Sequence, residues 1–147
     1  MRVRLRHPGE TPTLACTPSV RSLAVAIGNL ASVVLDCDDP RALADFWVQV
    51  VGGEIVFQTD DFVAIKTRRI WLATFRVSNY QPPAWPDGQI TKQLHLDVSV
   101  TDLDKAQNLA LAIGAQLPED QPSPDRWRVL LDPAGHPFCL SIQIPEI

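Results

Sequence analysis

Two stretches of this chain, residues 32–40 and residues 95–103, have the same pattern of residue types. Each is an alternating, strand-like run that leads directly into residues able to begin a helix. A repeat of this kind constrains the architecture more than local propensity does, because both copies must form the same supersecondary unit. The chain is therefore predicted to contain two copies of one structural unit.

Helix-start residues follow the strand-like run in each copy. In the first copy, Asp39 can cap a helix whose first residue is Pro40, where the missing N–H costs nothing. In the second copy, either Thr101 or Asp102 can act as the cap. Apolar residues then recur at helical spacing, and a glycine follows each predicted helix.

Three short β-like runs follow each helix, so each copy has the order strand, helix and three strands. The runs are 54–58, 62–66 and 70–77 in the first copy, and 116–117, 127–131 and 138–144 in the second. One helix cannot cover a sheet of this size and protect its edges. We therefore predict an α+β fold in which two tandem βαβββ modules pair about a pseudo-twofold axis into a curved, cup-like mixed sheet.

Proline-rich segments mark the expected boundaries. Residues 1–28 show no sustained period and are predicted to be a poorly ordered N-terminal extension. The folded domain is expected over residues 29–144, with modules at 29–79 and 92–144. Residues 80–91 contain several prolines that exclude a helix or an inner strand, and they are predicted to link the modules.

Composition excludes several kinds of partner. The net charge is −4 and no basic stripe is present, which argues against nucleic-acid binding. The three cysteines show no CxxC spacing, which argues against a disulfide framework or a zinc knuckle and favours a reducing, cytoplasmic location. The apolar stretch at 23–35 is too short to cross a bilayer, and no export signal is recognisable.

Four motifs in order resemble the glyoxalase-like domain subgroup of the glyoxalase, bleomycin-resistance and dioxygenase (vicinal oxygen chelate) superfamily. They lie at residues 33–47, 80–86, 93–98 and 132–140, and the resemblance covers about residues 30–144. It implies the paired βαβββ fold predicted from the repeat. It also implies that a homodimer is possible.

The resemblance implies four positions for the side chains that hold a divalent metal in most enzymes of the superfamily. Here these positions are Ser32, a residue on the strand around Trp71 to Phe75, His95 and Cys139. Only His95 is a usual ligand, and Cys139 stands where a glutamate is expected. One imidazole and one thiol without a carboxylate would bind such metals weakly, so we expect no functional metal centre and no other cofactor.

The period of two in a strand predicts which side chains face the cup. The polar set is Ser32, Asp36, His95, Asp97, Ser99, Cys139 and Ser141. The apolar neighbours expected under the helices are Val33, Leu35, Leu94, Leu96, Val98, Phe138 and Leu140.

His95 and Asp97 are the candidate catalytic residues, because they share one face and an imidazole can exchange protons near neutral pH. The alternatives are a structural histidine and a carboxylate held by a salt bridge or a backbone contact. Cys139 could act as a nucleophile only with a depressed thiol pKa, and otherwise fills the vacated metal position as a small buried residue.

The candidate ligand-binding residues are Ser32, Asp36, Trp71, Phe75 and Cys139. Asp36 could equally cap a loop, and the two aromatic rings could simply pack in the fold. His136 is predicted to be a turn residue bonded within its own loop, where Gly135 can adopt a positive φ.

These residues predict a protein that binds a small organic ligand in the cup, with metal-independent chemistry of the lyase or isomerase type. One alternative is a protein that sequesters a ligand without catalysis, as bleomycin-resistance relatives do. A second alternative is a divalent-metal lyase or dioxygenase.

Overall fold

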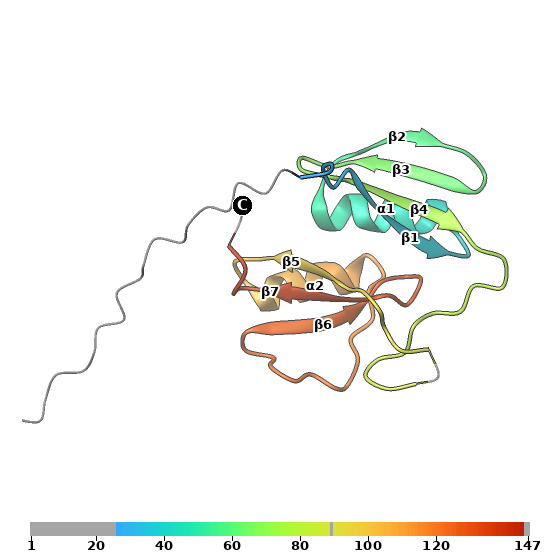
Figure 1. The fold of residues 1–147 in the computed structure, drawn as a ribbon. Coiled ribbons are helices and arrows are strands. Elements are labelled where there is room, and N and C mark those ends of the chain that lie inside the picture. Colours follow the sequence, from blue (N-terminus) through green and yellow to red (C-terminus); the bar gives the residue numbers. More distant parts are fainter. Residues whose placement is uncertain (1–25, 89, 146–147) are drawn as a thin grey trace, which may run out of the picture.

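The computed structural model describes residues 26–88 and 90–145, and it contains seven strands and two helices in that part of the chain (Figure 1). Nearly all of the predicted N-terminal extension lies outside the described residues. The first module contains β1 (Ser32–Cys37), α1 (Pro40–Val51), β2 (Glu54–Gln58), β3 (Phe62–Lys66) and β4 (Trp71–Arg76). The second contains β5 (Leu96–Ser99), α2 (Leu103–Ala112), β6 (Trp127–Leu131) and β7 (Pro137–Ser141).

Both helices begin at a capping aspartate. The Asp39 carboxylate accepts a hydrogen bond from the backbone N–H of Ala42 at 3.1 Å, and Pro40 is the first residue of α1. Asp102, rather than Thr101, caps α2 by accepting from the N–H of Lys105 at 2.9 Å. The predicted helix starts are therefore confirmed, and the open choice at the second is resolved.

The two modules form two sheets, with strand orders β1-β4-β3-β2 and β5-β7-β6. In each module the first strand runs parallel to the last, so the repeat is visible in the topology. The predicted strand at 116–117 is wrong, because only a single bridge joins Gln116 to Leu131. Pro118 follows immediately and has no N–H to donate, so pairing cannot continue.

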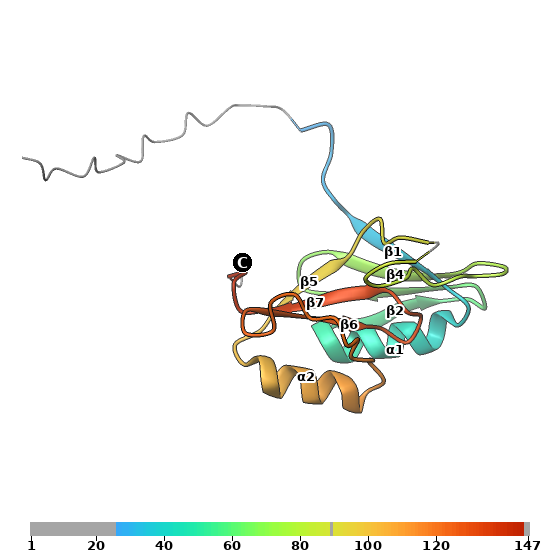
Figure 2. The same ribbon diagram turned by 90° about the horizontal axis from the view of Figure 1, so that it is seen from below.

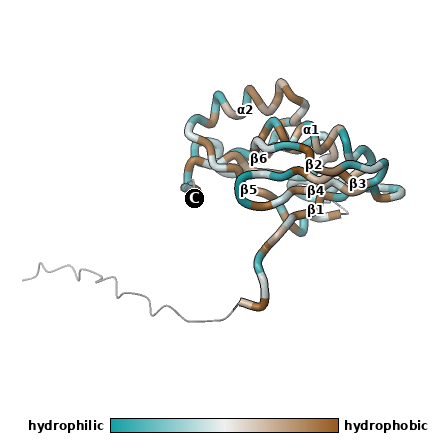
Figure 3. The backbone as a smooth tube through the Cα atoms, turned by 90° about the horizontal axis from the view of Figure 1, so that it is seen from above, coloured by the Kyte–Doolittle hydropathy of each residue, from teal (hydrophilic) through white to brown (hydrophobic). Residues whose placement is uncertain are grey.

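The sheets lie side by side, and both helices cover the same side of them (Figure 2). Helix α1 packs mainly on β3 and β4, and α2 packs on β7 and β6. Along α2 the hydropathy alternates between hydrophilic and hydrophobic residues, as expected for a helix with one face on a sheet (Figure 3). Neither described helix is long and apolar enough to cross a membrane.

Aromatic side chains join the two modules in one core. The rings of Phe46 and Trp47 on α1 lie 5.9 and 5.3 Å from the ring of Phe138 on β7, in edge-to-face arrangements. All three side chains are almost fully buried. Edge-to-face pairs contribute about 0.5–1.5 kcal/mol each beyond the area that they bury. The α+β fold with two paired modules is thus confirmed.

The predicted division between core and open face holds for most residues, but Leu94 departs from it, and on β7 the predicted polar residues Cys139 and Ser141 are buried as well, at 6% and 4% exposed. Leu35, Phe138 and Leu140 are buried as expected, but Leu94 is 65% exposed. Strand β5 begins only at Leu96, so Leu94 lies before the sheet and its side chain is not under α2.

Candidate functional site

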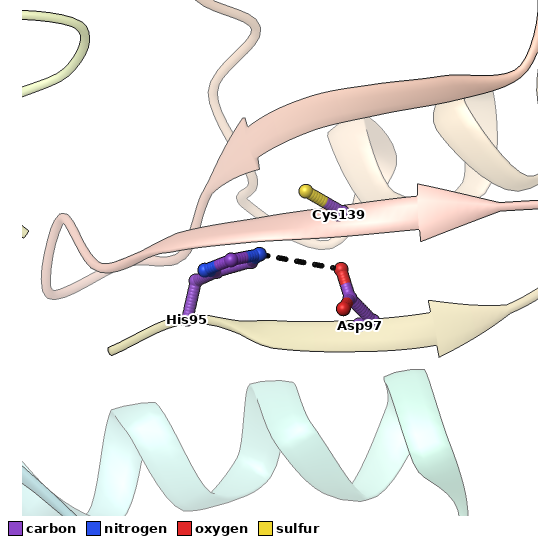
Figure 4. A group of neighbouring side chains, drawn as sticks. All are labelled: His95, Asp97 and Cys139. Carbon is purple, nitrogen blue, oxygen red and sulfur yellow. Dashed lines mark ion pairs between the residues drawn. The ribbon is translucent and has the colours of Figure 1, made fainter. Parts of the chain in front are cut away.

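Three side chains that can exchange protons or bind a metal lie together on the open face of the second sheet. His95 immediately precedes β5, Asp97 lies on β5, and Cys139 lies opposite Asp97 on the parallel strand β7. The Nε2 atom of His95 is 3.5 Å from Oδ1 of Asp97 (Figure 4). One nitrogen, oxygen or sulfur atom from each of the three residues lies within 4.8 Å of those of the other two.

Exposure differs within this group. The side chains of His95 and Asp97 are 37% and 42% exposed, so both can reach a molecule from solution. Cys139 is buried beside them. Burial, together with the charge of Asp97 and a hydrogen bond to it, raises the pKa of the Cys139 thiol to about 11, although Lys92 opposes the shift. The thiol is therefore protonated at neutral pH, which does not support Cys139 as an activated nucleophile.

Two of the three donors are separated by a distance that suits a divalent metal, and the ligand atoms of all three lie within 4.8 Å of one another. Neighbouring donors around a tetrahedral ion lie roughly 3.3–3.8 Å apart, and the separation between His95 and Asp97 falls in that range. Imidazole, carboxylate and thiol are all ligand types that zinc accepts. The four metal positions implied by the family resemblance do not include Asp97, which adds a carboxylate to His95 and Cys139. Binding would require Cys139 to lose its proton.

A cavity of about 270 Å³ opens between the modules beside this group. We call it the His95 cavity. Its lining residues include Val34, Leu35, Asp36, Trp47, Tyr80, Pro83, Ile90, Thr91, Gln93, Leu94, His95, Leu96, His136 and Pro137. They come from both modules and from the linker, so the cavity exists only because the modules pack together.

A second cavity, of about 410 Å³, lies on the other side of Trp47 and Leu96, which line both. Arg68 and Arg69 from the turn between β3 and β4 line it on the first-module side. Asp97 is on its second-module wall. His95 and Asp97 thus belong to neighbouring cavities, while their side chains remain in contact.

Of the five predicted ligand-binding residues, Cys139 is buried beside Asp97 and lines neither of these two cavities, and the other four separate into two groups. Asp36 lines the His95 cavity, so the structure brings it to the same space as His95. Ser32, Trp71 and Phe75 lie on the open face of the first sheet, where Ser32 pairs with Trp71 and Asp36 pairs with Phe75. Trp71 and Phe75 are 45% and 43% exposed, and neither of the two cavities described above is lined by them.

Sequence reasoning did not predict that Tyr80 and His136 line the His95 cavity. The hydroxyl of Tyr80 lies 3.0 Å from Nε2 of His136, and Nδ1 of His136 lies 3.0 Å from Oδ2 of the fully buried Asp132. The predicted bond of His136 within its own loop is confirmed by this contact to Asp132. The residue spacing gave no signal for the bond to Tyr80, because it depends on the path of the linker.

Comparisons with known proteins agree with this architecture. Residues 32–141 match the family described as glyoxalase-like domain. Two solved structures cover 77% of this chain. A glyoxalase/bleomycin resistance protein/dioxygenase family enzyme from Burkholderia phytofirmans PsJN has 19% identity, a TM-score of 0.59 and 97% of its own chain covered. A glyoxalase-related enzyme from Fulvimarina pelagi has 21% identity, a TM-score of 0.56 and 86% coverage.

A variant of the fosfomycin resistance protein FosX from Listeria monocytogenes, complexed with manganese(II) and a dihydroxypropylphosphonic acid, is also similar. It shares 14% identity and a TM-score of 0.62 over 80% of this chain and 94% of its own. At these identities the structural similarity concerns the fold. No curated protein matches this sequence.

Proposed function

The chain belongs to the glyoxalase-like domain family of the vicinal oxygen chelate superfamily, and from this premise we propose that it binds a small organic ligand in the His95 cavity. One observation carries the proposal: His95 lines a cavity between the modules and its Nε2 lies 3.5 Å from the Asp97 carboxylate. Concave sites that combine apolar walls with a few convergent polar groups are typical ligand sites.

His95 and Asp97 would supply the chemistry at this ligand. A carboxylate beside an imidazole accepts a hydrogen bond from the ring and fixes its orientation and tautomer. The pair could therefore take a proton from a bound molecule and return it at another atom, which is the basis of lyase and isomerase reactions. In this proposal no metal takes part, and Cys139 is a protonated, buried neighbour.

The test is a ligand screen followed by variants. The protein would be mixed with a panel of small amines, alcohols, ketones and carboxylic acids, and binding would be followed by saturation-transfer NMR. For any compound that binds, His95→Ala should weaken binding or abolish turnover. A matched control is Arg41→Ala, which removes an exposed side chain that contacts Asp45 and Gln58 on the first module. Unchanged binding and turnover in His95→Ala would remove His95 from the site.

The same screen separates an enzyme from a protein that only sequesters its ligand. An enzyme converts the bound compound to a product at substoichiometric protein concentration. A sequestering protein takes up one equivalent and releases it unchanged. The His95–Asp97 pair favours the enzyme, because binding alone does not require an imidazole beside a carboxylate.

A second candidate function is supported by the convergence of His95, Asp97 and Cys139. These three residues would hold a divalent ion, which when bound would polarise an oxygen of the ligand. Elemental analysis of the purified protein and a zinc titration would test it. Stoichiometric metal that is lost in Asp97→Asn, but retained in the control Asp60→Asn, would favour the metal site. Ligand binding that persists in a chelator would favour the metal-independent proposal.

A further inference from the structure

The His95 cavity contains a hydrogen-bonded chain that the His95–Asp97 pair does not use. Tyr80 contacts His136, and His136 contacts Asp132, at 3.0 Å in each case. Tyr80 and His136 line the cavity, whereas Asp132 is completely buried behind them. The chain therefore begins at the cavity wall and ends in the core.

The proton positions in this chain follow from its buried end. The Asp132 carboxylate accepts hydrogen bonds from the indole N–H of Trp47 at 3.1 Å and from the backbone N–H groups of Ala134 and His136 at 3.0 and 2.9 Å. All three of these N–H groups can only donate, so the Asp132 carboxylate acts as the acceptor. A neutral His136 ring therefore has its proton on Nδ1, facing Asp132, and its Nε2 atom free to accept.

This tautomer determines what Tyr80 can offer to a ligand. With the proton on Nδ1, the Nε2 atom of His136 is an acceptor, and the Tyr80 hydroxyl must donate its only proton to it. The Tyr80 oxygen then has only its lone pairs left to form a hydrogen bond with a ligand. Towards a molecule in the cavity, Tyr80 therefore acts as a hydrogen-bond acceptor when the His136 ring is neutral.

The wall of the cavity holds a second acceptor, which is charged. Asp36 contributes a carboxylate, and none of the described residues lining this cavity is a lysine or an arginine. Lys92, which follows the lining residue Thr91, has its Nζ atom 3.9 Å from the ring centroid of Trp85 instead. Burial raises the pKa of Tyr80, and the charges of Asp132 and Asp36 raise it further, as expected where the local potential is negative.

From this arrangement we propose that the ligand of the His95 cavity carries a cationic nitrogen, as a primary amine or an amidine does. Asp36 is the charge partner of this nitrogen, and the Tyr80 oxygen accepts one of its N–H groups. The apolar part of the ligand lies against Val34 and Leu94. The inference rests on the proposed function of the cavity and goes beyond it by naming a ligand class.

Three probes of similar shape test the inference: 2-phenylethylamine, 2-phenylethanol and 3-phenylpropionate. Binding to the full chain would be measured from ¹H–¹⁵N chemical-shift changes, which also show whether residues around the cavity respond. The amine should bind most tightly. Asp36→Asn and Tyr80→Phe should each weaken amine binding about tenfold, because a hydrogen bond to a charged group is lost. Binding of the alcohol should change less than binding of the amine in both variants.

The control is Asp60→Asn, which removes one exposed carboxylate far from the lining residues in the sequence and should leave all three affinities unchanged. Asp36 is exposed, so Asp36→Asn keeps the inference testable even if Tyr80→Phe loosens the linker. Tighter binding of 3-phenylpropionate than of the amine would overturn the inference, as would unchanged amine affinity in Asp36→Asn.

The two proposals fail in different ways. Binding of the alcohol or the acid at the cavity without binding of the amine contradicts the ligand class and leaves the binding function in place. The absence of cavity shifts with all three probes and with the wider panel contradicts the binding function itself.

Discussion

The indole Nε1 of Trp47 lies 3.1 Å from Oδ2 of Asp132, and this bond joins the helix of the first module to the last turn of the second. Both side chains are at most 1% exposed. A buried carboxylate must have donors around it, and Trp47 is the only donor to Asp132 that comes from the other module among the described contacts. The contact therefore couples the packing of the modules to the position of His136.

Removing either partner should destabilise the protein. We expect Trp47→Phe to lower the free energy of unfolding by about 1–3 kcal/mol, because a hydrogen bond to a charged group is lost. Asp132→Asn should cost about 3 kcal/mol, since an amide cannot accept from all the surrounding donors. Urea unfolding of both single variants and the double variant would give their coupling energy.

The control for this cycle is Trp71→Phe. Trp71 is 45% exposed on the open face of the first sheet, and its replacement should change stability by less than about 0.5 kcal/mol. A coupling energy near zero between Trp47 and Asp132 would show that the bond does not connect the modules energetically.

Gly135 should not tolerate a side chain. Its φ is +87°, and a Cβ atom there would lie 2.6 Å from Cβ of Pro82 in the linker. We expect Gly135→Ala to cost about 1–2 kcal/mol for the backbone conformation alone, with a further cost for displacing the linker. Thermal unfolding would measure the loss, and NMR of His136 would show whether its bond to Tyr80 is broken.

A useful comparison is Gly114→Ala. Gly114 also has a positive φ, of 110°, but a Cβ atom there would meet only Cγ of Pro133, at 3.8 Å, which is an ordinary contact. A loss of stability in Gly135→Ala no larger than in Gly114→Ala would argue against the close approach of the linker.

Local signals in the sequence were sufficient to predict the architecture of this chain. Asp39 with Pro40, and Asp102, begin helices because capping depends on neighbours within one turn. The predictions of a short strand at 116–117 and of a buried Leu94 were wrong, because they depended on more than local signals. Where a strand begins or ends depends on its partners and on nearby prolines, and alternation of residue types does not contain that information.

The candidate site was predictable only in part. The contact between His95 and Asp97 follows from their separation by two residues, since such side chains share a face. That Cys139 joins them requires the register between β5 and β7. The bond between Tyr80 and His136 joins residues 56 positions apart, and it depends on the course of an irregular linker. No periodic pattern encodes such a contact.

Asp97 should help to keep the Cys139 thiol protonated. Burial raises the pKa of this thiol most, and the charge of Asp97 and a hydrogen bond to it raise the pKa further. We expect Asp97→Asn to lower the pKa from about 11 towards the ordinary value of 9.0 without reaching it. The pH dependence of alkylation by iodoacetamide would report the change, in a background with Cys16→Ser and Cys37→Ala.

Asp104→Asn is the matched control, because Asp104 pairs with Arg128 on the helix side of the second sheet. An alkylation profile that is the same in Asp97→Asn as in the parent protein would show that Asp97 does not act on the thiol.

Both buried cysteines should make the protein less stable in alkali. The pKa of Cys37 and of Cys139 is raised from 9.0 to about 11, and burial is the largest cause for each. Between these values the unfolded chain releases protons that the folded chain retains, so the free energy of unfolding falls as the pH rises. The loss is at most about 3 kcal/mol for each thiol.

Urea unfolding at pH 8 and pH 10.5 would measure this loss for the native protein and for Cys139→Ala. The raised pKa of Tyr80 acts in the same direction in both proteins, so it cancels when they are compared. We expect the native protein to lose more stability over this interval than Cys139→Ala, because one titrating thiol has been removed. An equal loss in both proteins would mean that the Cys139 thiol ionises as readily in the folded chain as in the unfolded one.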